Sequence, residues 1–532
     1  MTRERVYLFD TTLRDGAQTQ GVDFSVEDKR TIALALDSLG LDYVEGGWPG
    51  ANPTDTAFFA DPPALKHARF TAFGMTKRSG RSASNDPGLA ALLSTSAPAL
   101  CLVGKAWDFQ VDVALEIPLA ENLDNISESI AAVVGKKREA LFDAEHFFDG
   151  YKANADYALS ALKVAFDAGA GFLVLCDTNG GTLPEEAYRI VSDVKARLPN
   201  ANLGIHAHND TEQAVAVSLA ALRAGARHIQ GTLNGLGERC GNANLCSIVA
   251  TLALKDAYAA QFETGVTLDA LTRLTSTSRL LDEILNRAPL HHAAYVGPSA
   301  FAHKGGLHVS AVQKNPRTYE HVPPESVGNQ RHILVSDQAG RSNIMARLAL
   351  LGIEVAASDK RIGRLLEDVK AREFLGYAYD GAEASFELLA RRALGQVPNY
   401  FQVESFRVMV ERRHNAVGDL VTVSEAVVKL NVAGVTFHNV GTGNGPVNAL
   451  DSALRKDLGR YSSYLQDLRL VDYKVRILTG GTEAVTRVMI ESADSHGNRW
   501  STVGVSENIV DASFEALSDS ICYKLYRDGA PA

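Results

Sequence analysis

The chain has 532 residues, of which 46% are hydrophobic and 22% are charged, a composition typical of a globular protein with two or three domains. Its formal net charge of −10 argues against non-specific binding to nucleic acid, and no apolar run of about 18 residues is present that could cross a membrane. Five scattered cysteines, and an N-terminal stretch (MTRERVYLFD) that leaves no room for a signal peptide, favour a cytoplasmic protein with reduced thiols.

Residues 1–262 alternate strand-like and helix-like segments. In the first helical segment, Ser25 can cap the helix, Gly40 can end it, and Ile32 and Leu36 belong to the buried stripe. Eight βα units in about 260 residues predict a TIM barrel, (β/α)8, although periodicity alone leaves an open, doubly wound sheet as the alternative. The strand-like segments are residues 6–10, 43–47, 69–74, 99–104, 139–145, 172–177, 203–208 and 228–233.

The rest of the chain has two further patterns. Residues 263–398 are mainly helical in pattern and predict connecting subdomains; they contain an irregular stretch, FAHKGGLHVSAVQKNPRTYEHVPPESVG, that is typical of a functional loop. Residues 399–532 return to alternating strand patterns and predict a C-terminal α+β domain. Within it, VG-x5-VNALDSAL (440–454) aligns with VG-x5-VDASFEAL (503–517), an internal repeat that predicts a duplicated strand–turn–helix unit.

Two histidines in the stretch GIHAHND indicate a metal site. His206 and His208 lie two residues apart at the end of a predicted strand, so they project to the same face. In a closed barrel the first, seventh and eighth strands are neighbours, and their loops can bring Asp15 and Asn242 to these histidines. A carboxylate, two imidazoles and an amide oxygen suit a divalent cation, and a ligand set without cysteine is typical of a catalytic site. Each residue alone also fits an ordinary structural role.

Several residues at other predicted strand ends are candidates for chemistry. Arg14 stays protonated and can stabilise an oxyanion beside the metal, and Glu45 either holds Arg14 or is an ordinary rim residue. Thr178 either donates to a substrate carboxylate or caps a helix. Glu145 is a candidate acid or base, with a plain solvated glutamate as the alternative. The stretch AHKGGLH, which contains His308, fits either a mobile lid or a flexible turn.

Three motifs, FDTTLRDGAQ, HAHND and GLGERCGNAN, together resemble the isopropylmalate, homocitrate and citramalate synthase family, whose members are metal-dependent acyl-CoA condensing enzymes on a TIM barrel. The resemblance covers essentially the whole chain, and GNGPVNAL resembles the family's regulatory domain, which binds an end-product amino acid. EGGWPGANPTD and GKAWDFQV resemble the citramalate synthase branch. The resemblance implies a divalent cation (Mg, Mn or Zn), acetyl-CoA and pyruvate as substrates, isoleucine as effector, and a homodimer.

The resemblance also implies residue roles. It implies four metal ligands: Asp15, His206, His208 and Asn242. It implies a catalytic set, the last two contributed by the partner subunit: Arg14, Glu145, His308 and Tyr319. Arg14 would contact the 2-oxo group and Thr178 the oxo-acid carboxylate. Asp143 and Leu100 stand where isopropylmalate synthases have serine and histidine, so both are expected to alter the oxo-acid pocket.

The implied reaction is a Claisen-type condensation of acetyl-CoA with pyruvate and hydrolysis of the thioester to (R)-citramalate, on a threonine-independent route to isoleucine. Three alternatives remain at this point. A sister synthase would use another 2-oxo acid. A lyase or aldolase would run the reverse reaction on the same barrel, although the long C-terminal domain argues against it. A non-catalytic amino-acid sensor would keep a dead barrel, although the intact set of site residues argues against that.

Overall fold

The computed structural model describes residues 3–285, 287, 289–333, 341–356, 358–414, 416–479 and 484–532. The chain divides into two compact units. The first unit comprises Met1–Phe301 and Val322–Gln330, and the second comprises Ala302–His321 and Arg331–Ala532. The finer division into three parts, with boundaries at residues 262 and 398, stays a prediction.

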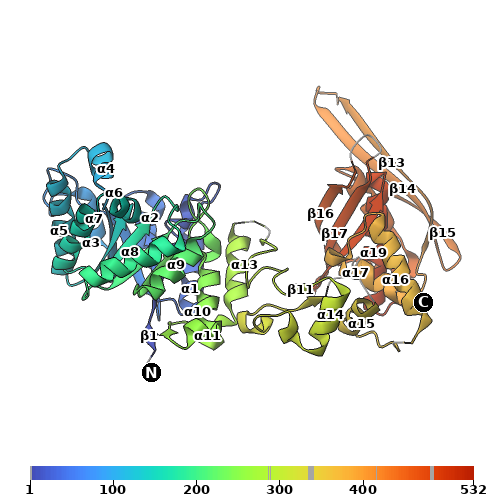
Figure 1. Cartoon of the computed structure of the whole chain (residues 1–532). Coiled ribbons are helices and arrows are strands. Elements are labelled where there is room, and N and C mark those ends of the chain that lie inside the picture. Colours follow the sequence, from blue (N-terminus) through green and yellow to red (C-terminus); the bar gives the residue numbers. More distant parts are fainter. Residues whose placement is uncertain are drawn as a thin grey trace. The chain divides into compact units, whose positions relative to one another are not determined.

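The first unit contains a closed barrel of parallel strands (Figure 1). In chain order these are β2 (Tyr7–Asp10), β3 (Tyr43–Gly47), β4 (Arg69–Met75), β5 (Ala99–Lys105), β6 (Glu139–Glu145), β7 (Phe172–Asp177), β8 (Leu203–Ala207) and β9 (His228–Gly231). Strand β9 pairs with β2, from Tyr7 opposite His228 to Asp10 opposite Gly231, and this pairing closes the barrel. The predicted TIM barrel is therefore confirmed, and the open sheet is excluded.

Helical segments follow the strands along the chain. They are α1 (Val26–Leu39), α2 (Pro53–Ala60), α3 (Pro87–Ser94), α4 (Asp108–Gln110), α5 (Leu119–Gly135), α6 (Phe147–Ala153), α7 (Ala155–Asp167), α8 (Pro184–Arg197), α9 (Ala214–Arg223), α10 (Leu245–Leu254), α11 (Asp256–Ala259), α12 (Leu268–Leu271) and α13 (Leu274–Ile284). A short parallel pair, β1 (Glu4–Arg5) with β10 (Phe262–Glu263), lies outside the barrel strands.

Helix α1 begins and ends where its sequence predicts. The Ser25 side chain accepts from the Asp28 N–H, and the Asp28 carboxylate accepts from the Ser25 N–H, which makes a capping box. Gly40 ends the helix at φ 93°, and a Cβ there would lie 2.7 Å from the Gly265 carbonyl oxygen, so only glycine fits.

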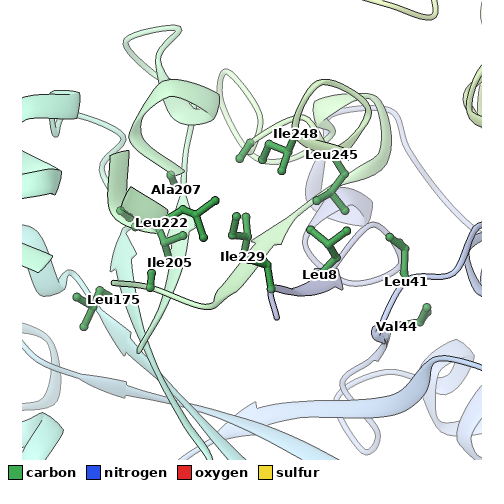
Figure 2. Packing of buried hydrophobic residues seen from close by; sticks show 14 of the residues in the cluster. Leu8, Leu41, Val44, Leu175, Ile205, Ala207, Leu222, Ile229, Leu245 and Ile248 are labelled. Carbon is green, nitrogen blue, oxygen red and sulfur yellow. The ribbon is translucent and has the colours of Figure 1, made fainter. Parts of the chain in front are cut away.

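The core between strands and helices is apolar. Figure 2 shows strand residues such as Leu8, Ile205 and Ile229 beside helix residues such as Leu222 and Ile248. Successive side chains of a strand alternate between this helix-facing core and the barrel interior. A separate cluster fills the interior: Phe9, Tyr43, Phe73, Ala99, Cys101, Leu141, Phe172, Val174 and Cys176. The barrel is therefore packed below its mouth, and open space for a ligand lies at the strand ends.

The second unit combines helices with two three-stranded antiparallel sheets. Its longer helices before the sheets are α14 (Gly306–Lys314), α15 (Arg341–Leu350), α16 (Lys360–Phe374) and α17 (Glu383–Ala393). The first sheet contains β13 (Gln402–His414), β14 (Leu420–Val432) and β15 (Val435–Gly443), followed by α18 (Pro446–Lys456). The second contains β16 (Arg469–Ile477), β17 (Thr486–Ala493) and β18 (Arg499–Ser506), followed by α19 (Ile509–Arg527). A two-stranded pair, β11 (Ala302–His303) with β12 (His332–Ile333), precedes α15.

Helix α14 lies in the stretch predicted to be an irregular loop. Val309 and Val312, three residues apart, are buried on one face of this helix, while the glycines and prolines around it hide the helical period in the sequence. Among the described residues, none of the helices has the length and apolar content that a membrane span requires.

The two aligned C-terminal stretches make the same close contact between a strand and the helix that follows. Gly441 in β15 lies against α18, where a Cβ would be 2.6 Å from the Ala449 carbonyl oxygen. Gly504 in β18 lies against α19, where a Cβ would be 2.0 Å from the Ala512 carbonyl oxygen. The absence of a side chain lets each helix pack directly on its strand. The duplication itself stays a prediction.

Candidate active site

A pocket of about 370 Å³ lies at the carboxyl ends of the barrel strands. Seven of the predicted site residues line it: Arg14, Asp15, Asp143, Glu145, Thr178, His206 and His208. They come from the ends of different strands, and a parallel barrel gathers all of these ends on one rim. This rim is where active sites of such barrels lie.

Asp15, His206 and His208 form a compact cluster in this pocket. Asp15 Oδ2 lies 3.2 Å from His206 Nε2 and 3.8 Å from His208 Nε2, and the two Nε2 atoms are 3.1 Å apart. All three side chains are buried, and each offers one ligand atom within 4.8 Å of the others. This donor set fits a divalent cation with coordination positions left for substrate.

Asn242 contacts the cluster through its side-chain amide. Its Nδ2 donates to Asp15 Oδ2 at 2.8 Å, while its Oδ1 is buried without a hydrogen-bond partner. The two ends of an amide are distinguished only by their hydrogen bonds, and a half-turn exchanges them. That half-turn directs the unpartnered oxygen toward Asp15 and His206, as a fourth ligand requires.

The electrostatics of the cluster favour a cation. Burial raises the pKa of Asp15, but Arg14 and His206 outweigh burial and hold this pKa well below the usual range, so the carboxylate is ionised. Burial, together with the nearby His206, lowers the pKa of His208 to about 4, so this ring is neutral near neutral pH. Burial also lowers the pKa of His206, but Asp15 outweighs it and the net direction is upward, so a cation competes with a proton there.

Arg14 is held rigidly at the edge of the pocket. Its Nε donates to Glu45 Oε2 at 2.7 Å, and its guanidinium carbon lies 3.8 Å from the centre of the Phe73 ring. Thr11 Oγ1 donates to the same Glu45 oxygen at 2.6 Å. A guanidinium fixed by a carboxylate and an aromatic face is pre-organised to stabilise negative charge in the pocket.

Two further polar side chains complete the rim. Glu145 Oε2 lies 2.6 Å from Lys105 Nζ. Thr178 Oγ1 accepts from the His146 N–H at 2.8 Å, which leaves its own hydroxyl proton free to donate. Lys105 ends β5 at the inward-facing phase of that strand, as expected for a residue at a predicted strand end, and its ion pair with Glu145 is a contact that the sequence did not indicate.

Leu100 differs from its predicted position. The resemblance placed it in the oxo-acid pocket, but it is buried in the helix-facing core and does not line the pocket. Cys101 and Val103 occupy the inward phase of β5, and Val103 lines the pocket. The two-residue period of the strand excludes Leu100 from the site.

Asp143 lines the pocket as predicted, and Gln230 is a polar neighbour that the sequence reasoning missed. Gln230 Nε2 donates to Asp143 Oδ1 at 2.9 Å, and Gln230 Oε1 lies 2.8 Å from His206 Nδ1. The signal for Gln230 was a polar residue in the segment HIQG, because buried parallel strands are otherwise largely apolar.

His308 and Tyr319 belong to the second compact unit, whereas the cluster above belongs to the first. His308 lies in α14, and Tyr319 follows the short 3-10 helix Pro316–Thr318. Their rings stack at a centroid distance of 4.2 Å, and both side chains are exposed. They form a pair, and their catalytic role stays a prediction.

Comparison with known families identifies three segments of the chain. Residues 5–278 match the HMGL-like family, and residues 295–373 match the homocitrate synthase post-HMGL domain-like family. Residues 380–525 match the LeuA allosteric (dimerisation) domain. The predicted combination of a TIM barrel with a C-terminal regulatory-type domain is thereby confirmed.

Relatives that match nearly the whole chain identify the branch of the family. The (R)-citramalate synthase of Aquifex aeolicus is 50% identical over 99% of this chain and 98% of its own length. That of Geobacter sulfurreducens is 50% identical over 98% of both chains, whereas a probable 2-isopropylmalate synthase of Methanopyrus kandleri is 32% identical over 97% of both. The chain therefore belongs to the HMGL-like family of metal-dependent enzymes and, within it, to the (R)-citramalate synthases, which are acetyl-CoA condensing enzymes.

Proposed function

We propose that this enzyme condenses acetyl-CoA with pyruvate at the barrel rim and hydrolyses the thioester to release (R)-citramalate. The single observation that carries the proposal is the cluster of Asp15, His206 and His208 beside Arg14, in a chain that is 50% identical to (R)-citramalate synthases. An anionic oxo acid needs a cation for its oxygens, and this cluster provides the ligands for one.

Asp15, His206, His208 and Asn242 would hold the divalent cation, which we propose to be Mg, Mn or Zn. When bound, it supplies a Lewis acid for the 2-oxo group. The chain contributes an ionised carboxylate at Asp15 and a neutral imidazole at His208, the protonation states that ligation requires, while at His206 the cation would displace a proton.

Arg14 and Thr178 would orient the oxo acid. Arg14 remains protonated and donates hydrogen bonds to the oxygen that becomes an alkoxide when the new carbon–carbon bond forms. Thr178 donates its free hydroxyl proton to the substrate carboxylate. Together these donors fix the reacting carbon in one orientation, which favours a single enantiomer of the product.

The pocket walls support a small oxo acid. Trp48 and Phe73 line the pocket and meet edge to face with ring centroids 5.6 Å apart. Val103 adds a third apolar wall, and Arg14 covers the outer face of Phe73. These bulky groups favour the methyl of pyruvate over a branched side chain, because an overfilled pocket costs binding free energy.

Acetyl-CoA would approach through a neighbouring hollow. A second pocket of about 340 Å³ shares Trp48, Met75, Lys105 and Glu145 with the first. A thioester arm in this hollow reaches Glu145, which is a candidate for removing a proton from the acetyl methyl group. Lys105 keeps that carboxylate oriented through their ion pair.

His308 and Tyr319 would complete proton transfer from the partner subunit of a homodimer. The match to a LeuA allosteric (dimerisation) domain supports both the dimer and feedback control. We further propose isoleucine as the effector, since it is the end product of the implied route, and a cytoplasmic location for this biosynthetic step.

The experiment is a free-thiol release assay with acetyl-CoA and a panel of pyruvate, 2-oxoisovalerate and 2-oxoglutarate. We expect pyruvate to have the highest kcat/KM, activity to disappear after chelation, and Mg²⁺, Mn²⁺ or Zn²⁺ to restore it. Isoleucine should inhibit at concentrations where leucine does not. Preference for another oxo acid, or full activity after complete metal removal, would refute the proposal.

A further inference from the structure

We infer that Gln230 and Asp143 are positioning residues that fix the His206 ring for cation binding. The inference rests on the proposed function, because it concerns the same metal cluster. It assigns Asp143 a role beyond lining the oxo-acid pocket, and it assigns Gln230 a role for the first time.

The observation is a buried chain of hydrogen bonds that crosses the barrel interior from β8 to β9 to β6. His206 Nδ1 lies 2.8 Å from Gln230 Oε1, and Gln230 Nε2 donates to Asp143 Oδ1 at 2.9 Å. Gln230 is completely buried, and His206 and Asp143 are nearly so. Polar groups at this depth need partners, and here each one supplies the next.

The chain determines which nitrogen of His206 carries the proton. Gln230 Nε2 donates to Asp143 Oδ1, so the amide oxygen of Gln230 faces His206. The oxygen is only an acceptor, so the proton of a neutral ring lies on Nδ1. The lone pair of Nε2 then faces Asp15 and His208, as a ligand atom must.

The other imidazole has the opposite arrangement. Arg239 Nη2 lies 2.8 Å from His208 Nδ1, and a guanidinium only donates, so the proton of a neutral His208 ring lies on Nε2. In a neutral His208 ring the proton must therefore leave Nε2 before this atom can bind a cation, whereas a neutral His206 ring already has its Nε2 lone pair free. Of the two imidazoles, only His206 has a partner that sets the binding tautomer in advance.

The test measures Mn²⁺ binding to the full chain by isothermal calorimetry, independently of turnover. Gln230→Met removes both hydrogen bonds at nearly constant volume, and we expect Mn²⁺ affinity to fall about 10–100-fold. Asp143→Asn still offers an oxygen to Gln230 Nε2 and should change affinity less than about threefold. Asp143→Leu offers none and should resemble Gln230→Met.

The pair of Asp143 variants separates two explanations. If Asp143 acted only through its charge, the Asn and Leu variants would lose the same affinity, and that outcome overturns the inference. The double variant Asp143→Asn/Gln230→Glu exchanges the amide and the carboxylate, so both hydrogen bonds can form and the carboxylate lies next to His206. This variant should bind Mn²⁺ at least as tightly as the native chain. Arg239→Ala is the matched control on the other imidazole and should not weaken binding.

The kinetic readout distinguishes positioning from a structural role. Saturating Mn²⁺ should restore most of kcat in Gln230→Met, because the substitution weakens binding of the cation and leaves the catalytic residues in place. If this variant does not fold, Gln230→Asn takes its place, because its amide is one methylene too short to span both contacts and should also weaken binding. If the native chain does not bind Mn²⁺ or does not use pyruvate, the proposed function is refuted. If the native chain binds Mn²⁺ and either Gln230 variant binds it with the same affinity, only this inference is refuted.

Discussion

His228 provides a quantitative test of how the barrel interior is built. Its side chain is completely buried, and neither ring nitrogen has a hydrogen-bond partner. The rings of Phe9, Tyr43 and Phe172 surround it at centroid distances of 5.2, 5.5 and 4.7 Å. Burial, with a smaller contribution from His206, lowers the pKa of His228 to about 3.

The low pKa makes the barrel sensitive to acid. An unfolded histidine has a pKa of about 6.5, so between about pH 6.5 and about pH 3 the unfolded chain holds a proton that folded His228 does not. Stability contributed at this position is therefore complete above about pH 6.5 and is lost as the pH falls. Between about pH 7 and about pH 5, titration of His228 lowers the free energy of unfolding by RT times the natural logarithm of about 25, which is about 1.9 kcal/mol. Any folded pKa below about 4 gives nearly the same value.

His228→Leu removes this proton linkage and two unsatisfied polar atoms. We expect its free energy of unfolding near pH 7 to exceed that of the native chain by about 1–3 kcal/mol. Between about pH 7 and about pH 5, the free energy of unfolding of this variant should fall by about 1.9 kcal/mol less than that of the native chain. Urea unfolding followed by fluorescence of Trp48 and Trp107, in a Trp500→Phe background, reports on the first unit. Equal losses in both chains would show that folded His228 keeps its proton or has a partner, and would refute the reasoning.

Two predictions concern other positions. Gly504→Ala places a Cβ 2.0 Å from the Ala512 carbonyl oxygen and should lower the free energy of unfolding of the second unit by about 1–3 kcal/mol, measured by urea unfolding followed by Trp500 fluorescence. Gly363→Ala adds a Cβ on a helix where no atom lies within 4 Å of it, and should raise the same free energy by about 0.5–1 kcal/mol. Equal effects of the two substitutions would contradict the packing argument. Arg14→Lys removes the planar guanidinium and its stacking on Phe73. In the free-thiol assay, kcat with pyruvate should fall about 100–1,000-fold, while Mn²⁺ affinity should change little. An unchanged kcat would contradict the role of Arg14 in stabilising the oxyanion.

The barrel and the metal cluster were predictable because both follow from short-range patterns. Alternating strand and helix segments specify βα units, and a parallel barrel brings every strand end to one rim, so Asp15 and the two histidines could be placed together without knowing any distance. Capping by Ser25 and termination at Gly40 were equally local signals.

The remaining errors and omissions arise from contacts across the barrel interior. Leu100 was placed by resemblance, but the period of β5 puts Val103 in the pocket instead. The link from Asp143 through Gln230 to His206 joins strands far apart in sequence, and no local pattern specifies which side chains meet. Helix α14 was missed because flanking glycines and prolines obscure two buried valines at helical spacing.

The pairing of β9 with β2 has a consequence for biogenesis. Asp15 follows the first barrel strand, whereas His206 and Asn242 come from the last two turns of the wall, so the ligand atoms meet across the seam where the circle is completed. The proposed cation site would therefore be complete only after synthesis has passed residue 242 and β9 has paired with β2. A cation held by these side chains would link the earliest and latest segments of the barrel, so its binding would stabilise the folded enzyme.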